Sequence, residues 1–243
     1  MRSLLRWRSS TGVNALTVIL LASAAGAGNL VENTLETGEN LLDTPQLVLL
    51  GAGGISSLVT AQLENDEGST GFLQGEPFRT ADKVDDFLFG PFLPASAAGV
   101  WLGGMALDSP WTEEFGEELC RGLFWTYGVT AGMKYAAGRT RPDGTDPLSF
   151  PSAHAAGASC TAAVLWNRYG PSAGVPAAAI ALYTCLSRVN TGRHFPSDAV
   201  MGAALGTACG LAASLSEDNG DREYRIGFMI SIDTSGRMMA SPW

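Results

Sequence analysis

Residues 199–215 read AVMGAALGTACGLAASL, an apolar segment that carries no charge. Within it, Gly202, Gly206 and Gly210 recur at every fourth position, and this spacing places all three on one face of a helix. A helix face lined with glycine lets a second backbone approach closely, as in the small-xxx-small pattern of tightly packed helices. The segment therefore predicts a helix that packs closely against a neighbour.

Five further apolar segments lie upstream of this one. They cover residues 47–63, 92–107, 123–137, 155–166 and 176–186. Breaks rich in Gly, Pro and acidic residues separate them, which is typical of the connections between helices. The stretch 64–77 is polar and contains three glycines, so we expect a long loop there. The pattern predicts an all-α fold, a helical bundle, in a single domain that covers residues 28–243.

The composition of the chain limits its environment and its partners. Of the 243 residues, 46% are apolar and 16% are charged, which excludes a disordered chain. The 24 acidic residues outnumber the 15 basic ones, and this balance argues against a nucleic-acid-binding surface. The apolar segments are shorter than the ~20 residues that a bilayer span needs, so a soluble or peripherally membrane-associated bundle is favoured. A multi-span integral membrane protein is the alternative.

The N-terminal residues 1–27 have the three-part layout of a secretory signal peptide. Arg2, Arg6 and Arg8 precede an apolar run over residues 13–22, and small residues follow as far as Ala27. We expect cleavage there and an exported protein, periplasmic or associated with the cell envelope. An uncleaved anchor helix is the alternative.

The four cysteines and the C-terminal end add two expectations. The cysteines are even in number and would meet an oxidising compartment after export, but each lies in or beside an apolar segment, where a free thiol is a small buried hydrophobe. Both states stay open for Cys120, Cys160, Cys185 and Cys209. At the end of the chain, apolar residues alternate from Ile226 to Ile232, which predicts a short β-strand or hairpin over about residues 225–243.

Polar residues gather in three clusters in a chain that otherwise avoids charge. In the first cluster, Lys134 and Arg141 are seven residues apart, so they share a helix face if the helix continues to Pro142. Two cations near a helix C-terminus also suit the helix dipole without any ligand. In the second cluster, Ser152 is a good N-cap for the next helix, and its hydroxyl and the free N–H groups beside it suit an oxyanion equally well.

The third cluster contains one of only two histidines in the chain, the other being His154. Asp198 follows His194 by four residues, which lets its carboxylate reach one imidazole nitrogen and leave the other as a nucleophile or base. An acidic residue in the first turn of a helix is also favoured by the dipole alone. Arg188 adds a planar cation that suits bidentate contact with phosphate.

The three clusters together resemble the signature motifs of a known family. The motifs are Lys134-x6-Arg141-Pro142, Pro151-Ser152-Ala153-His154 and Ser187-Arg188-x5-His194-x3-Asp198. In order and spacing they are similar to those of the type 2 phosphatidic acid phosphatase and vanadium haloperoxidase superfamily, in its bacterial acid-phosphatase-like form. The second motif usually reads Pro-Ser-Gly-His. Ala153 keeps the backbone N–H of that glycine, but it contacts phosphate only if its backbone is not left-handed.

The resemblance implies a role for each matched residue, at a phosphate site formed by helix ends. Lys134, Arg141 and Arg188 would bind the phosphate, assisted by Ser152 and the N–H of Ala153. His194 would attack phosphorus, Asp198 would orient His194, and His154 would protonate the leaving oxygen. No metal ion or other cofactor is implied, because the three cations neutralise the charge that a metal carries in many phosphatases.

The favoured function is therefore a metal-independent phosphatase that forms a phosphohistidine intermediate. Its substrate would be a phosphomonoester or diphosphate, with lipid phosphates among the candidates. A vanadate-dependent haloperoxidase, in which the same residues hold vanadate, is an alternative within the superfamily. A non-catalytic envelope protein that binds an anion at this cluster is an alternative from another class.

Overall fold

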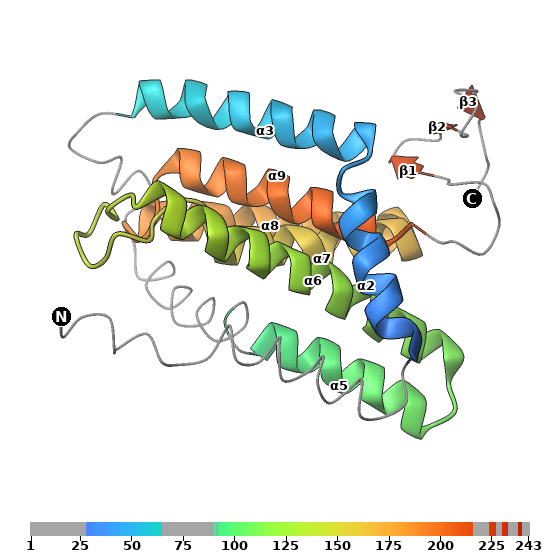
Figure 1. Cartoon of the computed structure of the whole chain (residues 1–243). Coiled ribbons are helices and arrows are strands. Elements are labelled where there is room, and N and C mark those ends of the chain that lie inside the picture. Colours follow the sequence, from blue (N-terminus) through green and yellow to red (C-terminus); the bar gives the residue numbers. More distant parts are fainter. Residues whose placement is uncertain are drawn as a thin grey trace.

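The computed structural model describes residues 28–64, 90 and 92–215, together with three short strands between residues 224 and 239 (Figure 1). The helices of this part are α2 (Gly28–Asn40), α3 (Thr44–Leu63), α5 (Leu93–Ala106), α6 (Pro110–Ala137), α7 (Ala153–Tyr169), α8 (Pro171–Asn190) and α9 (Pro196–Ala213). The expected all-α bundle is confirmed, and α2 is a helix that the apolar pattern did not indicate. The predicted signal peptide and residues 65–77 of the predicted loop lie outside the described residues.

Helix α9 occupies the middle of the bundle. It packs against α7 most extensively, and also against α3, α6 and α8, so several of the long helices run side by side along one direction (Figure 1). Its inward face is closely covered, since Leu205, Ala208, Cys209 and Ala212 are almost fully buried. Helix α5 packs on the outer side of α6.

The glycines of α9 lie against the backbone of α7, as the sequence predicts. A Cβ atom at Gly202, Gly206 or Gly210 would meet the main-chain carbonyl oxygen of Ser152, Ala156 or Cys160, respectively. The three glycines therefore let α7 and α9 approach along their whole shared length. This contact fixes the start of α7 next to the start of α9.

The glycine contact leads to a prediction about stability. Gly206→Ala is expected to lower the free energy of unfolding by about 1–3 kcal/mol, because the added methyl group overlaps the Ala156 carbonyl and forces the two helices apart. Gly51→Ala in α3 is the matched control, since nothing lies within 4 Å of a Cβ atom there and alanine is the better helix former. Thermal unfolding of the purified variants measures both effects. Equal unfolding temperatures for the two variants would contradict the close packing.

Several helix ends converge at one end of the bundle, among them the end of α6 and the starts of α7 and α9. Helix α6 ends at Gly138, which has a left-handed backbone with φ 56°, and the side chain of Ser152 accepts a hydrogen bond from the Ala155 N–H at the start of α7. Helix α9 begins with Pro196. Arg141 therefore lies in the loop after α6, and the interpretation that it shares a helix face with Lys134 is wrong.

Two of the helices in the described part of the chain have the length and composition of membrane spans. In α3 and α8 the apolar windows are 17% and 28% buried, respectively. Their exposed large apolar side chains are Leu47, Val48, Ile55, Leu58, Val59 and Leu63 on α3, and Val175, Ile180, Leu182, Tyr183 and Leu186 on α8. Both helices have 20 residues, longer than the apolar segments that the sequence suggested. The preference for helices buried in a soluble bundle is not supported for these two.

The remaining elements are the strands β1 (Tyr224–Ile226), β2 (Ile230–Ile232) and β3 (Met238–Met239). They pair antiparallel in the order β1-β2-β3, but the residues that connect them lie outside the described part. The C-terminal hairpin thus stays a prediction. The four cysteines are free thiols.

Candidate active site

The predicted site residues come from the helix ends at one end of the bundle. Arg141 contacts His194, and the Ser152 N–H donates to the main-chain oxygen of Asp198 at 2.9 Å. Arg188 lies in the last turn of α8, and its carbonyl oxygen accepts from the His194 N–H at 3.1 Å. Lys134 reaches the loop between α6 and α7, where its Nζ donates to the Leu148 oxygen at 2.5 Å. Ala153 and His154 follow Ser152 directly as the first two residues of α7.

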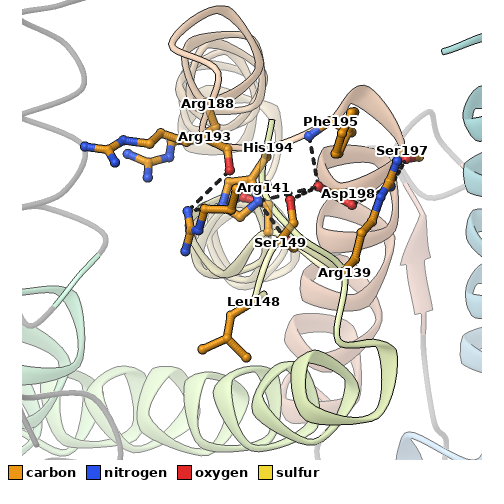
Figure 2. Close-up of polar contacts among 12 residues, drawn as sticks. Arg139, Arg141, Leu148, Ser149, Arg188, Arg193, His194, Phe195, Ser197 and Asp198 are labelled. Atoms are coloured by element: carbon orange, nitrogen blue, oxygen red, sulfur yellow. Dashed lines mark hydrogen bonds and ion pairs between the residues drawn. The ribbon is translucent and has the colours of Figure 1, made fainter. Parts of the chain in front are cut away.

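The imidazole of His194 is almost fully buried and held by one strong hydrogen bond (Figure 2). Its Nδ1 lies 2.7 Å from the main-chain oxygen of Ser149. A carbonyl oxygen only accepts, so Nδ1 carries the hydrogen and Nε2 keeps its lone pair. Nε2 faces the guanidinium of Arg141 at 3.4 Å. The backbone thus sets the tautomer that a nucleophilic Nε2 requires.

Asp198 lies behind the histidine but is not its main partner. Its Oδ2 is 3.7 Å from Nδ1 of His194, beyond hydrogen-bond length. The same oxygen accepts from the Ser149 hydroxyl at 2.5 Å and from the Phe195 N–H at 2.8 Å. Asp198 therefore holds Ser149 and the start of α9 in place, and Ser149 in turn orients His194. Sequence reasoning assigned the orienting contact to Asp198 alone and missed Ser149.

Arg139 is a second site residue that the sequence analysis did not single out. Its NH1 donates to Asp198 Oδ1 and to the Ser197 hydroxyl at 2.8 and 2.7 Å (Figure 2). Its NH2 donates to Glu64 Oε2 at 2.8 Å. Its guanidinium also stacks 3.9 Å from the centre of the Phe195 ring. Arg139 thereby joins the end of α3 to the start of α9.

The loop between α6 and α7 is tied to the loop that carries His194. The Asp143 N–H donates to the Gly192 oxygen at 3.1 Å, and Arg141 NH1 donates to the Arg193 oxygen at 3.3 Å. Arg141 Nε also bonds Asp146 at 2.9 Å, and its neighbouring charge holds the pKa of the Asp146 carboxyl below its usual range against the effect of burial. These contacts fix the guanidinium of Arg141 beside the imidazole of His194.

The start of α7 provides main-chain donors at the same place. Ala153 is the first helical residue and its φ is not positive, so the alanine in the second motif satisfies the backbone condition that a glycine would meet. The first N–H groups of a helix have no partner within the helix and favour an anion. Lys134 and Arg188, which are 8% and 2% exposed, lie close enough to His194 for their charges to act on it. The arrangement is suited to an oxyanion with several negatively charged oxygens.

Burial and charge both act on the histidine. Burial lowers the pKa of His194 to about 3, and the cations Lys134, Arg141 and Arg188 contribute in the same direction, while Asp198 opposes them. The imidazole is therefore neutral in the folded protein over the physiological range.

This pKa shift gives a prediction for stability against pH. Between pH 6.5 and about 3 the unfolded chain binds a proton at His194 that the folded chain does not, so the free energy of unfolding falls as the pH falls, by at most about 1.4 kcal/mol per pH unit. Thermal unfolding of the wild type and of His194→Gln between pH 4 and 7 measures this contribution. The variant should show the smaller slope, and identical slopes would contradict a buried neutral imidazole.

Comparisons with known proteins match the part of the chain that carries these residues. Residues 118–220 match the family model described as the PAP2 superfamily. The chain is similar to a lipid A 1-phosphatase of Porphyromonas gingivalis, with 42% identity over 34% of this chain and 19% of that protein. It is also similar to a decaprenylphosphoryl-5-phosphoribose phosphatase of Mycobacterium tuberculosis, with 36% identity over 37% of this chain and 54% of that protein. The chain thus aligns with only about a fifth and a half, respectively, of these curated relatives.

A solved structure shares the fold. A transmembrane PAP2 type phosphatidylglycerolphosphate phosphatase from Bacillus subtilis matches with a TM-score of 0.50 and 16% identity, over 83% of this chain and 94% of that one. At this identity the likeness concerns the fold alone. The shared fold covers more of the chain than residues 118–220, the segment matched by the family model.

Proposed function

We propose that this chain, which over residues 118–220 belongs to the PAP2 superfamily, is a phosphatase that removes phosphate from a lipid-linked phosphomonoester or diphosphate. One observation carries the proposal. The lone pair on Nε2 of a buried, neutral His194 faces Arg141, and the charges of Lys134 and Arg188 also act on this imidazole. The start of α7 lies beside it, because the Ser152 N–H donates to the main-chain oxygen of Asp198. A nucleophile surrounded by cations and main-chain donors is what phosphoryl transfer requires.

The proposed reaction has two steps. In the first, Nε2 of His194 forms a bond to phosphorus while the bond from phosphorus to the ester oxygen breaks, and His154 gives its proton to that oxygen. In the second, water attacks the phosphohistidine, His154 takes the proton, and inorganic phosphate leaves with His194 neutral again. Lys134, Arg141 and Arg188, with Ser152 and the Ala153 N–H, neutralise the phosphoryl oxygens in both steps, in place of a metal ion.

The proposed location of the site is the surface of a membrane. The exposed apolar faces of α3 and α8 suit a lipid environment, and the polar site lies where α3 and α8 end. A phosphate at that level would be attached to a lipid whose chains enter the bilayer. The similarity to two phosphatases whose names specify lipid-linked substrates supports this class, and it favours neither the haloperoxidase nor the non-catalytic alternative. The exported location likewise stays a proposal, supported by the N-terminal sequence.

Release of inorganic phosphate tests the proposal directly. The purified full chain in lipid nanodiscs is assayed with a lipid phosphate and with an activated aryl phosphate, each with EDTA present. We expect release from both substrates and no loss on chelation. Arg188→Ala should raise KM or lower kcat for both, because it removes a cation from the phosphate. A folded protein that releases no phosphate from either substrate would contradict the proposal.

A further inference from the structure

An apolar groove opens on the side of the bundle between α7, α8 and α9. Its volume is about 500 Å³, and its walls include Ser159 and Trp166 of α7, Ala178 and Cys185 of α8, and Ala203 and Thr207 of α9. The volume falls within the range of pockets that hold small ligands, which are mostly apolar. Of the polar groups in the wall, the Thr207 hydroxyl already donates to the Ala203 oxygen within its own helix. The groove therefore suits a hydrocarbon ligand.

The groove begins close to the phosphate site and leads away from it. On α8, Cys185 precedes Arg188 by three residues, and on α9, Ala203 follows Asp198 by five. At 1.5 Å per residue these separations are about 5 and 8 Å along the helix axes. From Cys185 the α8 wall continues to Ala178, about another 10 Å from the site. The long direction of the groove thus follows the helices from the catalytic end into the apolar part of the bundle.

We propose that this groove holds the hydrocarbon chain of the substrate while the phosphate lies among Lys134, Arg141 and Arg188. The inference rests on the proposed function and deepens it, since it makes the apolar chain a recognised part of the substrate. Three observations select this occupant. One end of the groove lies about one helical turn from Arg188, most of its wall is apolar, and α8 bears further exposed apolar side chains such as Ile180 and Leu186. A chain can enter from the side without leaving a lipid environment.

A series of alkyl phosphates tests the groove. Butyl and octyl phosphate are assayed below their micelle concentrations with the full chain in nanodiscs, and the octyl to butyl ratio of kcat/KM is compared between variants. Each buried methylene contributes at most about fourfold, so four of them raise the wild-type ratio by up to about 200-fold. Ala178→Trp and Ala203→Phe obstruct the groove from opposite walls, and each should lower the ratio at least tenfold.

Ala179→Trp is the matched control. Ala179 neighbours Ala178, is exposed in the same way and is absent from the groove wall, so the ratio should stay at the wild-type value. Partitioning of the alkyl phosphates into the nanodisc is the same for all variants, so it cancels when their ratios are compared.

An unchanged octyl to butyl ratio in both groove variants, with butyl phosphate still hydrolysed, would overturn the proposed role of the groove and leave the proposed function standing. A wild type that hydrolyses neither ester would overturn both. A change of oligomeric state in the groove variants, with no change in the ratio, would identify the groove as a contact between protein helices and also overturn the inference.

Discussion

His194→Ala is expected to reduce kcat by roughly 10³-fold or more for every phosphate ester, because it removes the atom that forms the bond to phosphorus. The side chain is 2% exposed, so the variant also leaves a cavity, and His194→Gln fills more of that space with a side chain that does not attack phosphorus. Both variants should be inactive while their unfolding temperatures differ. Phosphate release and thermal unfolding, measured on the same preparations, separate loss of chemistry from loss of fold.

His154→Ala distinguishes the two histidines by their dependence on the leaving group. General acid catalysis contributes typically 10²–10⁴-fold, and it matters most when the departing oxygen is a strongly basic alkoxide. The variant should lose most of its activity on an alkyl phosphate and much less on an activated aryl phosphate, whose leaving group departs as an anion. His194→Ala should lose its activity on the alkyl phosphate and on the aryl phosphate to the same extent. Retained activity of His194→Ala on either ester, or equal losses in His154→Ala, would contradict the roles assigned to the histidines.

The sequence predicts the main features of the fold because they depend on local chemistry. Gly202, Gly206 and Gly210 indicate a close helix contact by spacing alone, and the structure places them against α7. The starts of α7 and α9 follow from Ser152 as an N-cap and Pro196 in the first turn. The sequence was less informative about α8, since the helix begins at Pro171 and continues through Pro176. The apolar segment begins only at Pro176, inside the helix, and it is therefore too short to indicate a bilayer span.

The parts of the site that sequence reasoning missed depend on contacts far apart in the chain. Ser149 acts on His194 through its main-chain oxygen, and a backbone carbonyl leaves no signal in the identity of a residue. Glu64 bonds Arg139, which lies 75 residues away in the sequence, and only the packing of α3 on α9 brings the two side chains together. Two signals were available. Arg139 is a third cation between Lys134 and Arg141, and Gly138 is a typical helix stop that places Arg141 in a loop.

Asp198→Asn is expected to act mainly by displacing Ser149 and the start of α9. We do not expect it to change the tautomer of His194. The carboxylate is 0% exposed and accepts from Arg139 on one oxygen and from Ser149 and Phe195 on the other. An asparagine has one acceptor oxygen, so its NH2 group must face a donor on one side. Breaking a buried ion pair costs about 3–5 kcal/mol, and the 30% exposure of Arg139 reduces this cost. We expect a loss of about 2–3 kcal/mol in the free energy of unfolding.

The kinetic effect of Asp198→Asn should be smaller than that of His194→Ala. A catalytic aspartate that bonds the histidine directly contributes about 10⁴-fold in serine proteases, but here the Ser149 carbonyl keeps the hydrogen on Nδ1. We therefore expect kcat to fall by about 10²-fold as Ser149 and the start of α9 shift, with a smaller change in KM. Ser149→Ala is the matched control, because it removes the hydroxyl that Asp198 holds and keeps the carbonyl that orients His194. Its kcat should fall by only a few-fold. A loss in Asp198→Asn as large as in His194→Ala, at temperatures where both are folded, would mean that Asp198 acts on the imidazole directly.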